Sequence, residues 1–122
     1  MQTDIRHPIG EFVVERKPSV ETCKTASDRI KVMSSKFKKV VDLLDDTQLG
    51  TPYCLGGWTI RQIVHHIADS QMNGYVRFKL ALPLENPTIL PYDQDAWAAL
   101  PDAANSPVDV SVDMVDSLNK RW

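Results

Sequence analysis

The chain has 122 residues, a length that suits one folded domain and is too short for two of ordinary size. Hydrophobic residues make up 43% of it and charged residues 25%, with a formal net charge of -2 at pH 7. This balance is ordinary for a globular protein, and it excludes a basic nucleic-acid-binding domain and a disordered tail. A local basic cluster at Lys36, Lys38 and Lys39 is followed by Asp42 and Asp45, so we interpret it as a solvated helix face.

A first long helix is predicted from Ser19, a favourable N-cap residue, to about Asp45. Its apolar residues recur at alternating steps of four and three, the narrow stripe of a bundle helix: Ala26, Ile30, Met33, Phe37, Val40 and Leu44. Gly50 and Pro52 prevent the helix from continuing.

A second long helix is predicted to begin at Thr59, where Gln62 stands at the position that completes a capping box. Pro83 ends it. The residues of its inner face are Ile60, Ile63, Val64, Ile67, Gln71, Tyr75, Phe78 and Leu82.

Two further helices follow a proline-rich connection. Asp93 caps a short helix that we expect to pass through Trp97 and to stop at Pro101, and a last helix opens around Ser106 and Pro107. Its apolar stripe is Val108, Val112, Val115, Leu118 and Trp122. The sequence therefore predicts one all-α domain over residues 1–122, with about three walls of a bundle plus a short extra helix. A bundle short of one helix would leave an apolar groove exposed.

Two adjacent histidines, His65 and His66, lie on the second predicted helix. Neighbouring residues diverge by about 100° around a helix, so at most one of them points at any interior site. Periodicity does not choose between them. From spacing alone, a packed and hydrogen-bonded histidine is the more common outcome, because a zinc or nickel site needs three or more ligands.

A resemblance changes that expectation. The block from Gly56 to Ser70, GGWTIRQIVHHIADS, is similar to a sequence signature of the YfiT-type members of the DinB-like superfamily, which are bacillithiol S-transferases or metal-dependent hydrolases. The similarity includes the opening His-Pro-Ile-Gly at residues 7–10 and extends to Arg121 and Trp122.

The resemblance implies a four-helix bundle with a divalent metal, zinc or nickel, held by three histidines. One histidine lies on the second helix and corresponds to His66. The other two form an H-x-x-x-H pair on a fourth helix, before which this sequence ends. His65, as a hydrogen-bonding neighbour of the ligand, and Gln71, where the family often has histidine, are predicted as accessory residues.

We therefore expect a metal-dependent transferase or hydrolase in which the metal activates a low-molecular-weight thiol or water towards a small electrophile. Because this chain supplies only His66, its status as an enzyme stays open. One alternative is a non-catalytic helical module that dimerises through the groove left by the missing helix, and another is a fragment with no site function.

The remaining expectations concern partners and minor residues. A cytoplasmic location is expected, since Cys23 and Cys54 make a poor disulfide framework. The net charge and the lack of a long apolar run give no reason to expect a nucleic-acid or membrane partner, and a homodimer is expected from the resemblance to bundle proteins. Arg77 and Lys79 are assigned to a solvated face, with steering of an anionic thiol as the alternative. The aromatic residues Trp58, Tyr75 and Trp97 are assigned to packing, with the lining of a pocket as the alternative.

Overall fold

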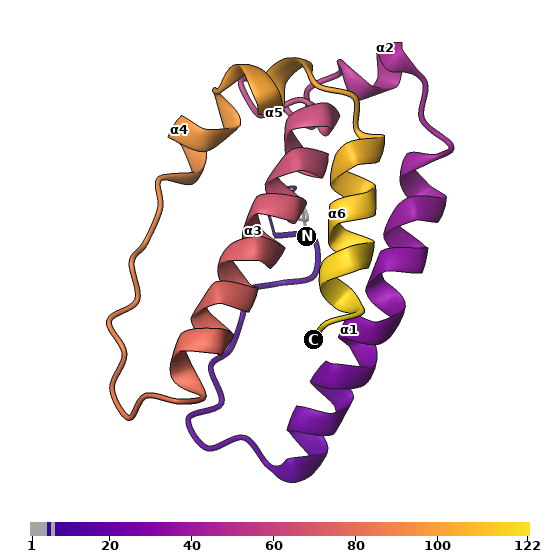
Figure 1. Ribbon diagram of the computed structural model, residues 1–122. Coiled ribbons are helices and arrows are strands. Elements are labelled where there is room, and N and C mark those ends of the chain that lie inside the picture. The colour runs from indigo at the N-terminus through magenta and orange to yellow at the C-terminus, as the bar shows by residue number, and fades with distance from the viewer. Residues whose placement is uncertain (1–4, 6) are drawn as a thin grey trace.

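Three long helices dominate the computed structural model, which describes residue 5 and residues 7–122 (Figure 1). They are α1 (Val20–Val41), α3 (Ile60–Ala81) and α6 (Asp109–Asn119). Three short helices connect them: α2 (Asp46–Leu49), α4 (Gln94–Ala98) and α5 (Pro101–Asn105). Within the described residues, β pairing is limited to an isolated bridge between Pro52 and Thr59. The predicted all-α class is confirmed; residues 1–4 and 6 of the predicted domain lie outside the described part.

Helix α6 is the central element of the packing. It packs closely against α3 on one side and α1 on the other, while α4 and α5 cover the N-terminal end of α3 (Figure 1). Val41, Val64 and Val112 form a buried cluster that draws one residue from each long helix. No helix in the described part of the chain is both long enough and apolar enough to span a membrane.

Side-chain caps fix the starts of α1 and α3, as predicted. Ser19 Oγ accepts a hydrogen bond from the backbone N–H of Thr22 at 3.0 Å. At the start of α3, Thr59 Oγ1 accepts from the N–H of Gln62 at 3.2 Å, and Gln62 Oε1 accepts from the N–H of Thr59 at 2.8 Å. This reciprocal pair satisfies two of the backbone donors that a helix start leaves without partners.

The first helix ends earlier than predicted, at Val41 rather than about Asp45. The reason is a second capping box, because Asp45 and Gln48 exchange hydrogen bonds and begin the separate helix α2. An aspartate that caps a new helix adopts an extended backbone, so it cannot also continue the old one.

The face of α1 that packs against α6 also differs from the predicted inner face. Val40 is 61% exposed, whereas the residues of α1 that are buried are Ser34 and Val41. Ser34 hydrogen-bonds Asp116 of α6, so the face with a buried serine is the one that contacts α6. The apolar stripe through Met33 and Phe37 is left beside α3.

Pro101 does not act as a stop. Helix α4 ends at Ala98, and Pro101 then occupies the first position of the new helix α5, where a missing backbone N–H costs nothing. The last helix begins at Asp109, slightly after the predicted Ser106–Pro107.

Val115 should be a sensitive point of the core, because it is 0% exposed. Replacing it with alanine should lower the free energy of unfolding by about 2 to 3 kcal/mol, from lost apolar burial and the cavity left behind. Val110→Ala on the same helix is the matched control, since Val110 is 56% exposed and its loss should cost under about 0.5 kcal/mol. Urea denaturation measures both, and equal losses would show that α6 is rotated differently.

Candidate metal-binding groove

The two adjacent histidines have different environments. His65 is 6% exposed and lies between α3, α5 and α6. Its Nδ1 is 2.7 Å from the hydroxyl of Ser111, and its Nε2 is 3.0 Å from the carbonyl oxygen of Ser106. Because a carbonyl only accepts, Nε2 carries the proton and donates, so in the neutral ring Nδ1 accepts from Ser111. Both nitrogens are engaged away from His66, which gives His65 a place in the packing of α3 on α6.

His66 turns to the other side of α3 and is partly buried. Its ring meets that of Trp58 edge-on, with the ring centroids 4.9 Å apart and the planes at 63°. Trp58 is itself held by α4, because its Nε1 donates to a carboxylate oxygen of Asp95 at 3.0 Å. The indole and α4 therefore limit how the His66 ring can rotate.

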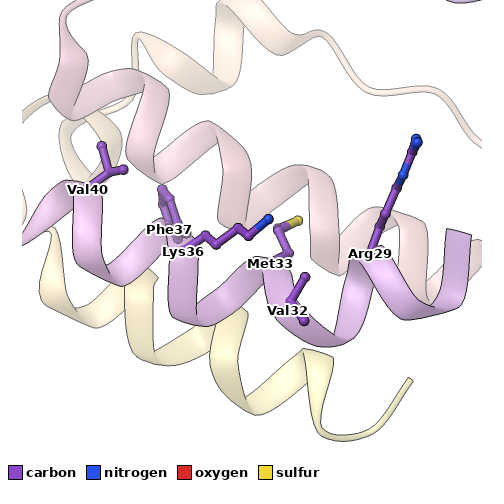
Figure 2. Close-up of a pocket in the computed structure, with 6 residues that line it drawn as sticks. All are labelled: Arg29, Val32, Met33, Lys36, Phe37 and Val40. Carbon is purple, nitrogen blue, oxygen red and sulfur yellow. The ribbon is translucent and has the colours of Figure 1, made fainter. Parts of the chain in front are cut away.

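His66 opens into a groove between α1 and α3. Met33 and Phe37 line it from α1, and Ile67, Ser70 and Gln71 line it with His66 from α3, around a cavity of about 270 Å³. Met33 and Phe37 also line an adjoining hollow of about 380 Å³ along α1. Figure 2 shows this hollow, with its six labelled residues all on α1 and α3 running beside it. The two hollows form one largely apolar surface with an imidazole at its edge.

Burial sets the charge state of His66. Loss of solvent lowers the pKa of His66, and the nearby carboxylate of Asp69 offsets part of this by raising it. The pKa of Asp69 is raised in turn, by burial first and then by Asp102. A histidine whose pKa lies below its usual value is neutral at pH 7, and the neutral imidazole is the form that binds a metal.

Gln71 lies on the same groove. Its side-chain N–H₂ approaches Met33 Sδ at 3.6 Å, while its Oε1 is buried with no hydrogen-bond partner among the described residues. A buried, unpartnered amide oxygen is costly, so it marks a place where a donor group from outside these residues would be stabilised.

The described residues contain no group of three or more His, Cys, Asp and Glu side chains placed to hold a metal ion. Of the three predicted site residues, His66 and Gln71 share the groove and His65 lies apart from it, hydrogen-bonded within the core. The groove therefore offers a metal ion one suitable ligand, the neutral imidazole of His66, on a largely apolar wall.

Sequence reasoning missed how much of the groove comes from residues assigned elsewhere. Trp58 was assigned to packing, with the lining of a pocket as the alternative, and the sequence did not indicate that it packs on the candidate ligand. Its place just before the N-cap Thr59 is a usable signal, since residues there pack on the first turns of the helix. Met33 and Phe37 were assigned to the bundle core, and a stripe pattern alone cannot say which neighbour a helix face meets.

An open apolar groove between two long helices, with one neutral imidazole facing it, defines the class as a helical bundle with a candidate metal site. Comparisons with known proteins agree. A family model described as "DinB superfamily" matches residues 29–120. A protein of Bacillus cereus strain B4264, described as "Putative metal-dependent hydrolase", is 51% identical over 119 residues, covering 98% of this chain and 68% of the relative.

A Bacillus anthracis protein (strain A0248) with the same description is 50% identical over 119 residues, with the same coverage. Among solved structures, that of YfiT from Bacillus subtilis, described as "a probable metal-dependent hydrolase with an unusual four-helix bundle topology", superposes with a TM-score of 0.92. It is 42% identical and covers 97% of this chain and 67% of its own. The chain belongs to the DinB superfamily, and the predicted resemblance is confirmed.

Replacing His65 with alanine should lower the free energy of unfolding by about 2 to 4 kcal/mol, because the Ser111 hydroxyl loses its partner, the Ser106 carbonyl loses one of its donors and a cavity opens. The matched control is His66→Ala, which removes a partly exposed ring and should cost about 1 kcal/mol or less. Denaturant titration of the metal-free variants compares the two. A larger loss for His66 would contradict the assignment of His65 to the core.

The pKa of His66 in the metal-free protein should lie below 6.5, because burial disfavours the charged ring. In the unfolded chain His66 takes up its proton first as the pH falls, so its contribution to stability is complete above pH 6.5 and is lost between 6.5 and the folded pKa. Asp69→Asn should lower this pKa further. Histidine NMR titration measures both, and a pKa at or above 6.5 would refute the burial argument.

Proposed function

We propose that this protein is a metal-dependent hydrolase or transferase in which His66 is one ligand of a zinc or nickel ion. The observation that carries the proposal is the neutral imidazole of His66, held against Trp58 and facing the α1–α3 groove. Membership of the DinB superfamily and the descriptions of the Bacillus relatives support it.

The remaining ligands in this proposal come from a further helix that carries an H-x-x-x-H pair and packs into the groove. About a third of the length of the B. cereus relative lies outside the aligned region, which is long enough for such a helix. The apolar lining from Met33, Phe37 and Ile67 suits one face of an amphipathic helix. The buried Oε1 of Gln71 offers that helix an acceptor for one of its donor groups.

A zinc or nickel ion held by His66 and the proposed histidine pair would act as a Lewis acid and favour deprotonation of a thiol or water. The described residues supply the surroundings. His66 contributes a neutral ring, Trp58 restricts its orientation, and the apolar side chains of Met33 and Phe37 would exclude water once a further helix covers the groove. We propose a low-molecular-weight thiol or water as nucleophile and a small electrophile as acceptor.

The proposed setting is a cytoplasmic homodimer. Cys23 and Cys54 are both free thiols, which suits a reducing compartment.

In the complete protein, including any segment beyond Trp122, His66→Ala should weaken zinc or nickel binding at least tenfold, since one of about three ligands is lost. His7→Ala is the control, because it removes an exposed imidazole of the N-terminal segment and should leave metal binding unchanged. Elemental analysis after dialysis gives the metal content per subunit. Full metal content in His66→Ala would remove His66 from the ligand set.

A further inference from the structure

We propose that Arg77 binds an anionic oxygen group of the substrate, a carboxylate or phosphate, on the same strip of α3 as His66. This assigns a substrate class, an extended small molecule with an acidic end, to the site proposed above, and it rests on that proposed function.

The first observation is that Arg77 is partly buried and that its Nε has no hydrogen-bond partner among the described residues. This nitrogen is itself buried, and no described carboxylate forms a salt bridge with the guanidinium. Arg61, on the same helix, shows what a structural arginine does here. Its Nη1 donates to the carbonyl of Ser106 at 3.0 Å and its Nη2 to Asp46 at 2.6 Å. Leaving a buried N–H of a cation unpaired is costly, which favours a ligand as its partner.

The second observation is alignment. His66, Ser70 and Arg77 are spaced by four and seven residues, so they lie on one strip along α3. His66 and Arg77 are eleven residues apart, a rise of about 16 Å along the helix axis. A molecule that reacts near His66 and places its acidic group at Arg77 must therefore be extended.

The third observation is the residue between them. Tyr92 comes from the connection after α3, packs its ring on Trp97 with the centroids 4.6 Å apart, and hydrogen-bonds Ser70. Burial, and after it the charge of Asp69, raises the pKa of Tyr92. The charge of Arg77 and the hydrogen bond with Ser70 lower this pKa, so Tyr92 lies within the electrostatic influence of both Asp69 and Arg77. Its hydroxyl stays neutral at pH 7 and offers a polar contact at the middle of the strip.

Charge along the strip then sets the direction of binding. The carboxylate of Asp69 is close enough to affect His66, whereas the guanidinium of Arg77 stands at the other end. An anion is disfavoured near Asp69 and favoured near Arg77. In the metal-free protein, an acidic group is therefore favoured at Arg77 and not beside Asp69.

The test is an NMR titration of the metal-free protein with two probes, succinate and inorganic phosphate. The side-chain Nε–H signal of Arg77 should shift and saturate with at least one probe, together with the backbone amide signals between Ser70 and Arg77. Arg77→Met should weaken binding at least tenfold, and Arg77→Lys should weaken it less, because the charge remains but the paired donors are lost.

Lys79→Met is the matched control, since Lys79 is an exposed cation two residues away that points to the opposite side of α3. It should change the affinity by less than twofold. The absence of a saturable shift, or equal weakening by Arg77→Met and Lys79→Met, would overturn the proposal and leave Arg77 as a solvated cation.

The outcome is independent of the metal site. His66→Ala should retain the binding of succinate or phosphate, because the anion contacts the far end of the strip. Metal binding without anion binding would reject the role of Arg77 and keep the proposed function. Anion binding without metal binding would keep the role of Arg77 and reject the proposed function. The probe that binds more tightly identifies the acidic group as carboxylate or phosphate.

Discussion

The hydrogen bonds of His65 determine how α3 sits in the bundle. The two ring nitrogens reach Ser111 and Ser106, which lie 46 and 41 residues further along the chain. A helix held through one buried side chain cannot rotate about its axis without breaking both bonds. Because neighbours diverge by about 100°, fixing His65 in the core also fixes the directions of His66, Ser70 and Arg77. The candidate site is thus a consequence of a contact made on the other side of the same helix.

Side-chain contacts also define the two ends of the groove. At one end, Gln62 donates to the carbonyl of Ala98 at 2.7 Å, so α4 is held over the first turn of α3 next to Trp58. At the other end, the Trp122 ring lies where a side chain at Gly74 would meet it at 3.6 Å, and it packs on Phe78 with the centroids 5.4 Å apart. A Cβ at position 74 would be in ordinary van der Waals contact with this indole, so the ring covers the helix surface here. The open part between these ends contains His66.

Local signals in the sequence were sufficient for much of the fold. Ser19 and Thr59 begin helices because their side chains satisfy backbone donors nearby, and such contacts are encoded within three or four residues. The rotation of α1 could not be predicted this way, because Met33 and Phe37 fit a core stripe equally well whichever helix lies opposite. Likewise, periodicity left His65 and His66 equivalent. Only the position of Ser111, far along the sequence, separates them.

A physical reason favours placing His66 and Arg77 at separate points along α3. Burying an imidazole keeps it neutral, and a neutral ring suits a cation but contributes no charge to hold an anion. In the metal-free protein, the fixed positive charge that an acidic molecule can meet on this strip is that of Arg77, because arginine keeps its charge under all ordinary conditions. In the proposed site, the three turns between Arg77 and His66 would limit the repulsion between the guanidinium and a metal ion. Length along the helix then becomes a criterion for selecting substrates, because a short acid cannot contact both ends.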